Sequence, residues 1–231
     1  MGSSRKVFVG EKALKYDEFF STKYGRKVFL LEKDLMAYCL KNLKVSSVLE
    51  VGCGTGVWGE FWKDYLKARF VAGLDISYDM LRLARTKGFG ELLLGSAESM
   101  PFKEKSFDLV AFVTSLEFIE NREKTVWEAL RVTKRYLAVG YLNRFSFLAF
   151  KRRVKSFFHR SVYKKAQFLT EKEIEKLVGR VAEKIGKSVN LIKGGTTLNF
   201  STERFVSLKL ERFLSFNLPF GGFGFVVFEV G

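Results

Sequence analysis

The chain has few of the residues that cross-link small proteins or connect separate domains. Its 231 residues include two cysteines, two prolines and one histidine. Cys39 falls at an apolar position of an expected helix and Cys53 falls in a glycine-rich turn, which is neither a disulfide framework nor a zinc spacing. No Pro- or Ser-rich linker is present. We therefore expect a single domain over residues 1–231, in a reducing compartment and without a metal.

Long hydrophobic runs are also missing. No apolar run approaches the roughly 18 residues of a membrane span, and residues 1–6 lack the apolar core of a signal peptide. A cytoplasmic protein with no transmembrane segment is the expectation, and its oligomeric state is left open. With 40 Lys and Arg against 25 Asp and Glu, the net charge is +15. Such a surface attracts nucleic acid, anionic lipid or acidic substrates, or is simply solvated.

Strand-like and helix-like runs alternate along most of the chain. An amphipathic helix is expected over 27–43, and a capping box of Thr170 and Glu173 predicts a later helix start. The remaining expected elements are strands at 47–51, 69–74, 92–94, 107–113, 136–142, 189–193 and 223–230, and helices up to about 66, at 78–86 and at 123–132. This order predicts an α/β fold of the Rossmann-like type. Its seven-stranded sheet is mostly parallel, with the last strand antiparallel and helices on both faces.

The segment VLEVGCGTG (48–56) carries the clearest chemical information. An apolar strand runs into three glycines at alternate positions, so the turn can be tight and a ligand can approach the backbone at a helix N-terminus. Asp75 ends the next strand, 21 residues after Gly54. A carboxylate there can accept both hydroxyls of a ribose, as in adenosine-binding sheets.

A nicotinamide-dependent dehydrogenase is the competing interpretation, because residues 54–59 match the dinucleotide fingerprint GxGxxG. Two details count against it. An acidic residue, Glu50, lies inside the first strand, two residues before the first glycine. The strand already ends at Gly52, so the fingerprint begins too late.

Five segments in order resemble the successive motifs of class I S-adenosylmethionine-dependent methyltransferases. They are VLEVGCGTG (48–56), GLDIS (73–77) with Met80 and Leu81, SAESMPF (96–102), FDLV (107–110) and TSLEFIEN (114–121). The likeness extends over residues 16–180 and is greatest to the small-molecule subgroup that includes the ubiquinone and menaquinone biosynthesis methyltransferases. YDEFF (16–20) and AQFLT (166–170) look like further segments of that subgroup.

The resemblance implies S-adenosylmethionine as cofactor and gives roles to single residues. Gly52 and Gly54 would hold its methionine end, Asp75 its ribose, and Ile76 its adenine. Ala97 and Glu98 would border the adenine, and Thr114 and Ser115 would lie beneath the sulfonium and face the acceptor. The residues expected in the cofactor site are Tyr16, Glu50, Gly52, Gly54, Gly56, Asp75, Ile76, Met80, Ala97, Glu98, Thr114 and Ser115.

The sequence departs from the subgroup at two places. A Pro-Gly-Gly turn before the fifth strand is missing, and a histidine common after the fourth strand is replaced by Phe118. The second departure weakens any transfer of quinone acceptor chemistry to this chain. His159 and Glu117 are candidate bases, each with an ordinary structural reading beside it. No catalytic residue is therefore assigned.

Residues 144–165 form a basic, aromatic insertion with eight Lys or Arg and no Asp or Glu. Aromatic and cationic side chains can bind nucleic acid, lie on an anionic membrane, or form a helical lid over an apolar substrate. We expect a small apolar or aromatic acceptor, with RNA bound through 144–165 as the alternative and a non-catalytic cofactor-binding subunit as a further one. The expected regions are an N-terminal helical cap (1–45), a cofactor-binding core (46–142), the insertion and its helix (143–186), and C-terminal strands (187–231).

Overall fold

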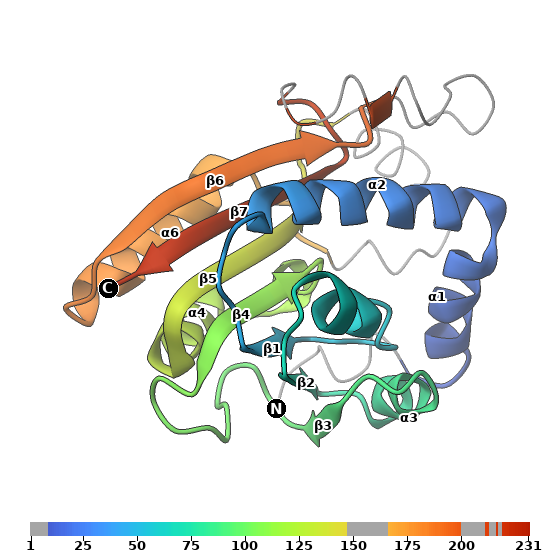
Figure 1. Cartoon of the computed structure of the whole chain (residues 1–231), viewed down its shortest axis with the longest axis horizontal. Coiled ribbons are helices and arrows are strands. Elements are labelled where there is room, and N and C mark those ends of the chain that lie inside the picture. The colour runs from blue at the N-terminus through green and yellow to red at the C-terminus, as the bar shows by residue number, and fades with distance from the viewer. Residues whose placement is uncertain (1–8, 147–165, 200–210, 213–215, 217–218) are drawn as a thin grey trace.

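A single seven-stranded sheet organises the computed structural model, which describes residues 9–146, 166–199, 211–212, 216 and 219–231. The strand order is β3-β2-β1-β4-β5-β7-β6 (Figure 1). The strands are β1 (Ser47–Val51), β2 (Phe70–Asp75), β3 (Glu91–Leu94), β4 (Phe107–Val113), β5 (Thr133–Leu142), β6 (Val189–Thr197) and β7 (Phe223–Val230). The pairings among β1 to β5 are parallel, and β7 runs antiparallel to both of its neighbours, β5 and β6. The predicted fold class is confirmed.

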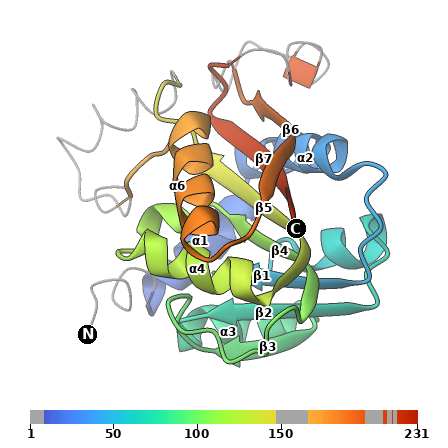
Figure 2. The same cartoon turned by 90° about the vertical axis from the view of Figure 1, so that its left-hand side faces the viewer.

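Helices cover both faces of this sheet. Figure 2 shows α2 on one face and α4 with α6 on the other. The helical elements are α1 (Glu11–Ser21), α2 (Lys23–Leu40), η2 (Phe61–Tyr65), α3 (Tyr78–Thr86), η3 (Leu116–Phe118), α4 (Arg122–Val132) and α6 (Glu171–Lys184). The predicted capping box starts α6, where Thr170 Oγ1 accepts from the backbone of Glu173 and the Glu173 carboxylate accepts from the backbone of Thr170.

The core consists of two layers, one on each side of the sheet. Alternate residues of β4 show this, because Leu109 and Ala111 pack with α2 and η2, whereas Val110 and Phe112 pack with α4 and α6. Such a strand is buried on both faces, as parallel strands between helices usually are. Each fully buried large apolar side chain contributes roughly 1.5–3 kcal/mol. The two layers thereby fix the carboxyl ends of the strands, where the candidate site lies.

Several element boundaries differ from the sequence expectations. Helix α2 begins at Lys23 rather than at residue 27, because Thr22 Oγ1 accepts from the backbone of Gly25 and caps it. Strand β5 begins at Thr133 rather than 136, and β6 extends to Thr197 rather than 193. The added part of β6 pairs with β7. That pairing is a long-range contact which local composition does not reveal.

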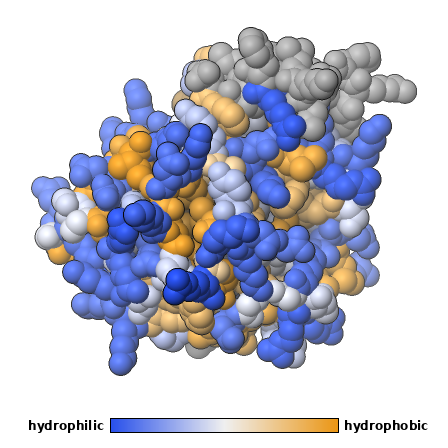
Figure 3. All heavy atoms as spheres, viewed as in Figure 1, coloured by the Kyte–Doolittle hydropathy of each residue, from blue (hydrophilic) through white to orange (hydrophobic). Residues whose placement is uncertain are grey.

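Most of the predicted helical lid lies outside the described residues, since these omit 147–165 and with them His159. Its base is described, because Asn143 and Leu169 form a β-bridge where the insertion leaves and rejoins the core. No described helix is long and apolar enough to cross a membrane. On the face shown in Figure 3, hydrophilic side chains cover most of the described surface and hydrophobic ones lie between them.

Candidate active site

The loop after β1 lies at the point where the strand order changes direction, between β1 and β4. Ligands of open α/β sheets bind at such a switch point, outside the carboxyl ends of the strands. The backbone N–H groups of Gly52 and Cys53 both donate to Leu74 O, at 2.7 and 3.2 Å. These hydrogen bonds hold the loop against the carboxyl end of β2.

The three glycines of this loop have positive φ angles but different surroundings. A Cβ on Gly52 would lie 2.5 Å from Ser115 Cβ, and one on Gly56 would lie 2.9 Å from Ala84 Cβ. A Cβ on Gly54 would meet no atom nearer than Tyr16 Cε1, at 3.9 Å. Close packing therefore explains why positions 52 and 56 are glycines. Gly54 leaves an open surface beneath Tyr16, which suits the close approach of a ligand to the backbone.

Asp75 holds the same loop from the end of β2. Its Oδ2 accepts from Gly54 N and its Oδ1 from Ser77 N, both at 2.8 Å. Helix α3 is capped by Ser77, whose Oγ accepts from Met80 N, so Asp75 is not the helix cap. Burial raises the pKa of Asp75, while the backbone N–H bonds oppose the rise. Because each carboxylate oxygen can accept twice, Asp75 can still accept from a ligand hydroxyl beside its backbone N–H donors.

Glu50 lies beneath the loop rather than on its surface. The side chain is 1% exposed, and Oε2 accepts from Trp62 Nε1 at 2.7 Å. Burial raises the pKa of Glu50 to about 8, against the lowering effect of the indole hydrogen bond. Folding therefore favours the neutral form of this carboxyl group. The structure places this predicted site residue in the core at the end of β1, hydrogen-bonded to Trp62.

The predicted adenine-side residues lie on the next two turns of the same edge. Ile76 is half-buried beside Asp75, and Met80 is buried in the first turn of α3. Ala97 and Glu98 are half-buried in the turn after β3. The Glu98 carboxylate accepts from Asn121 N at 3.3 Å, which links this turn to the segment after β4.

Thr114 and Ser115 bring the end of β4 against the glycine loop. Ser115 Oγ donates to Val51 O at 2.7 Å, and Thr114 N donates to Gly140 O in β5 at 2.8 Å. Thr114 has a φ of +50°, which is rare for a β-branched residue. Such strain costs about 1–3 kcal/mol and is concentrated at functional sites.

Glu117 follows in η3 and is 1% exposed. Its Oε1 accepts from Leu142 N at 2.6 Å, and its backbone oxygen accepts from Gln167 N at 3.0 Å. Burial raises the pKa of Glu117 to about 7, opposed by the Leu142 hydrogen bond and by the positive charge of Arg122. Glu117 therefore contacts the end of β5 through its side chain and the far end of the insertion through its backbone.

Sequence reasoning missed the way in which α1 is held over the loop. The Lys87 ammonium pairs with Asp17 of α1 and lies 3.3 Å from Thr55 Oγ1, while Gly10 N donates to Asp79 at 2.7 Å. No periodicity or motif pairs residues 70 positions apart. The sequence shows a basic residue, Lys87, and an acidic residue, Asp17, but it does not show that they form a pair.

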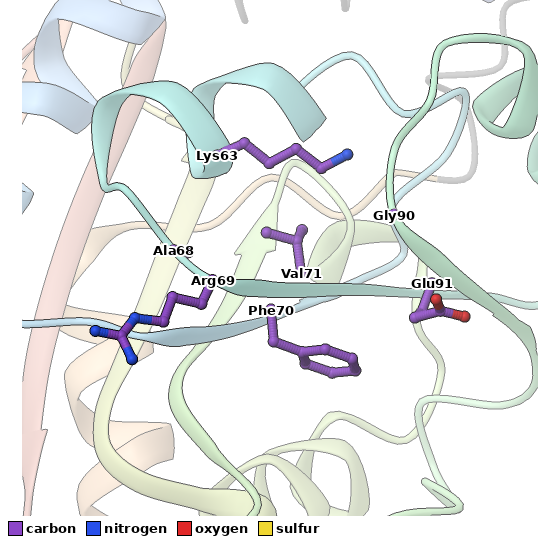
Figure 4. A pocket seen from close by; sticks show the side chains of 7 residues that line it. All are labelled: Lys63, Ala68, Arg69, Phe70, Val71, Gly90 and Glu91. Carbon is purple, nitrogen blue, oxygen red and sulfur yellow. The ribbon is translucent and has the colours of Figure 1, made fainter.

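The pocket drawn in Figure 4 is not part of this site. Lys63 and Phe70 lie on opposite sides of the strand in that view. The lining residues are Lys63, Ala68, Arg69, Phe70, Val71, Gly90 and Glu91. These residues include the first ones of β2 and β3, so the pocket opens at the amino ends, across the sheet from the glycine loop. Within the described part of the chain, no group of three acidic, Cys or His side chains could hold a metal ion.

Comparison with known proteins identifies relatives of this chain. A family model described as a methyltransferase domain matches residues 49–136. The uncharacterized protein MJ1123 of Methanocaldococcus jannaschii is 31% identical over 183 residues, which cover 77% of this chain and 83% of that protein.

Two relatives with named activities match shorter stretches. The 18S rRNA (guanine-N(7))-methyltransferase of Mus musculus is 30% identical over 53% of this chain and 46% of its own length. The demethylmenaquinone methyltransferase of Thermotoga maritima is 32% identical over 38% of this chain and 39% of its own length. The matches thus span less than half of each of these two proteins.

Solved structures agree on the fold along nearly the whole chain. A methyltransferase of Thermotoga maritima that depends on S-adenosylmethionine, described as a possible histamine N-methyltransferase, has a TM-score of 0.75 at 25% identity, covering 98% of this chain and 99% of that one. The magnesium protoporphyrin IX methyltransferase of Synechocystis, solved with bound S-adenosylhomocysteine, has a TM-score of 0.68 at 16% identity and covers 97% of each chain. None of these relatives supports a nicotinamide-dependent dehydrogenase. With its five ordered motifs, its strand order and its relatives, the chain belongs to the class I S-adenosylmethionine-dependent methyltransferases.

Proposed function

We propose that this methyltransferase acts on a small apolar or aromatic acceptor bound above the carboxyl ends of β4 and β5. One observation carries the proposal: two large aromatic side chains are exposed there, Phe145 by 71% and Phe220 by 61%. Asn143 ties them together, because its Oδ1 accepts from Phe145 N and its Nδ2 donates to Pro219 O. Exposed aromatic surface at the mouth of a site is typical of apolar ligand binding.

On the cofactor side, the proposal assigns the open surface over Gly54 to the methionine end and the oxygens of Asp75 to the ribose. Tyr16 covers the loop, Gly52 and Gly56 shape it, and Glu50 supports it from below. The adenine would lie among Ile76, Met80, Ala97 and Glu98, and the reacting end beside Thr114 and Ser115. The open face of Gly54 and the unused lone pairs of Asp75 support this assignment.

Methyl transfer requires little covalent chemistry from the protein itself. Bound S-adenosylmethionine supplies an activated methyl group together with its leaving group. The residues of the chain orient the two reactants for an in-line displacement and exclude water. Ser115, anchored on Val51 O, holds the end of β4 at a fixed position relative to the loop.

The proposed organisation keeps one domain over residues 1–231. Residues 1–45 cap the site, 46–142 form the cofactor-binding core, 143–186 hold the insertion and α6, and 187–231 supply the last strands. The contacts of α1 with α3, made through Lys87 and Asp79, support the assignment of a cap.

A direct test incubates the protein with S-adenosylmethionine and pools of small aromatic amines, phenols and carboxylic acids. Release of S-adenosylhomocysteine with at least one pool is the expected result. Turnover with RNA and with no small-molecule pool would contradict the proposal.

RNA is the second candidate, because eight of the net fifteen positive charges lie in residues 144–165 and one relative is named as an rRNA methyltransferase. Binding through phosphates weakens steeply with salt, whereas an enclosed apolar ligand hardly responds. Filter binding of mixed RNA over a salt series, repeated with Arg152, Arg153 and Lys155 changed to Glu, separates the two. Tight, salt-sensitive binding that is lost in the variant would favour RNA.

A further inference from the structure

One carboxyl oxygen of Glu117 has no hydrogen-bond partner in the described structure. Oε1 accepts from Leu142 N, but Oε2 is buried and has no hydrogen-bond partner. Leaving a buried polar atom unpaired costs about 1–3 kcal/mol, so such an atom in a native protein calls for an explanation, of which a catalytic role is one. The other buried acid of this edge, Glu50, has its Oε2 paired with an indole N–H.

The position of Glu117 relates it to the acceptor rather than to the cofactor. Two residues before it, Ser115 packs on Gly52 of the cofactor loop. Its own carboxyl group reaches the last residue of β5, Leu142, one position before the bridge of Asn143 and Leu169 that closes the base of the insertion. The unpaired oxygen thus belongs to the part of the edge where β4, β5 and the insertion meet.

The charges around Glu117 are few. Arg122 of α4 donates to the backbone oxygens of Leu116 and Glu117 and is the charged group that acts on the carboxyl. Arg122 in turn is influenced by Glu173 of α6 and by Arg144 after β5. Arg144 pairs with Glu173 at 2.7 Å, so these two charges largely offset one another. Desolvation therefore dominates, and it raises the pKa of Glu117 to about 7.

We propose that Oε2 of Glu117 binds the N–H or O–H of the acceptor's nucleophile and takes its proton during methyl transfer. This inference rests on the proposed small-molecule function and names its acceptor class: an amine or hydroxyl compound with an apolar body. A group that titrates near neutral pH is well matched to such a proton transfer.

The step balances without any further reactant. The lone pair of the nucleophile forms the bond to the methyl carbon, and the electron pair of the breaking carbon–sulfur bond stays on sulfur. The proton released from nitrogen or oxygen goes to Oε2, converting the carboxylate to the neutral acid. Solvent removes it after the product leaves.

The first experiment compares the wild type, Glu117→Gln and the control Glu123→Gln, whose carboxylate lies on the surface of α4. Phenethylamine and 4-ethylphenol serve as probes, with S-adenosylhomocysteine release as the readout at pH 8. We expect Glu117→Gln to lower kcat by about 100-fold or more, the lower end of general base contributions. The affinity of Glu117→Gln for S-adenosylhomocysteine should stay within threefold of that of the wild type. The turnover of Glu123→Gln should also stay within threefold of the wild-type turnover.

The pH profile gives a readout that a structural role would not move and that needs only the wild type. Activity requires the unprotonated carboxylate, so kcat/KM should rise through pH about 7. The limb is read with 4-ethylphenol, whose hydroxyl keeps its proton up to about pH 10, because the reactive neutral fraction of phenethylamine itself rises with pH over this range. Turnover by the wild type with no such limb, or with Glu117→Gln within threefold of it, overturns the inference and leaves the proposed function standing.

If neither probe is methylated, the small-molecule proposal fails for amines and phenols, and turnover cannot test the role of Glu117. Infrared difference spectra then test whether the probes contact its carboxyl group. The protein carrying S-adenosylhomocysteine at pH 6 should show a protonated carboxyl band that is absent from Glu117→Gln. A shift of that band on adding phenethylamine or 4-ethylphenol supports contact of the nucleophile with Oε2. A band that neither probe moves, or no such band, overturns it.

Discussion

The glycine-loop end of the site and the β4–β5 end differ in whether their buried polar groups have hydrogen-bond partners within the chain. At the loop end, Gly54 N is paired with Asp75, and Glu50 is paired with Trp62. At the β4–β5 end, Glu117 keeps a buried oxygen unpaired and Phe145 is largely exposed. The first region is complete as a scaffold, whereas the second leaves contacts for a ligand to complete. This contrast agrees with the proposal that the acceptor binds at the β4–β5 end.

The largest effect should come from the packing of the loop. Gly52→Ala would combine left-handed strain of roughly 1–2 kcal/mol with overpacking against Ser115 of roughly 1–3 kcal/mol. We expect urea unfolding to report a loss of about 2–5 kcal/mol. Gly186→Ala, at φ +65° with no neighbour within 4 Å, should lose only the strain component. Equal losses in the two variants would mean that the loop does not rest on Ser115.

The buried acid beneath the loop should make stability depend on pH. The pKa of Glu50 is raised from about 4.5 to about 8 on folding, so the folded state holds its proton where the unfolded state releases it. Its stabilising contribution is complete below pH 4.5 and is lost as the pH rises through 8. Between pH 5 and 8, we expect the wild type to lose about 2–4 kcal/mol more than Glu50→Gln.

Urea unfolding at the two pH values measures this difference. The control is Glu123→Gln, an exposed acid whose pKa is lowered by Lys184 and Arg180. If Glu50→Gln and the wild type change in parallel, the acid is not neutral in the folded protein.

Local signals explain which features the sequence predicted correctly. The capping box of Thr170 and Glu173 spans four residues, and β4 carries its apolar pattern within seven, so both were predictable. The length of β6 depends on pairing with β7, more than twenty residues away. No local pattern carries that information.

The candidate site divides in the same way. The motif resemblance named Glu50 and Asp75, but not that Glu50 is buried beneath the loop with Trp62, twelve residues away, as its partner. It also left Glu117 without a role, because the contact with Leu142 N joins residues 25 positions apart. Composition records that a charge is present, whereas its burial and partners depend on the folded sheet.

The contribution of Asp75 to the cofactor half should be next in size. Asp75→Ala would remove the charge-assisted hydrogen bonds that we propose between this carboxylate and a ribose, each worth roughly 1.5–3 kcal/mol. Affinity for S-adenosylhomocysteine, measured by calorimetry, should fall by about 10- to 150-fold. The control Asp64→Ala removes an exposed carboxylate of η2 and keeps both Asp75 and the contacts of α1. Unchanged affinity in Asp75→Ala would remove this carboxylate from the site.

The smallest effect concerns the hold of α1 over the loop. Helix α1 fully buries only Ala13 within its own length, and its Phe19 and Phe20 pack against aromatic rings of α2. The Lys87–Asp17 pair adds a contact between α1 and the end of α3. Both side chains of this pair are about one-third exposed, and an ion pair of that kind contributes roughly 0.2–1 kcal/mol.

Lys87→Met should therefore weaken binding of S-adenosylhomocysteine by about two- to fivefold, because Tyr16 is then held less firmly over Gly54. Added salt should reduce the difference between the wild type and the variant, since it screens the pair that the variant lacks. Lys15→Met is the matched control: it removes a lysine from α1 itself, paired only with the exposed Glu11, and should leave affinity unchanged. If both variants bind S-adenosylhomocysteine alike at low and high salt, α1 does not contribute to cofactor affinity. Its contacts would then stabilise the fold of the cofactor half alone.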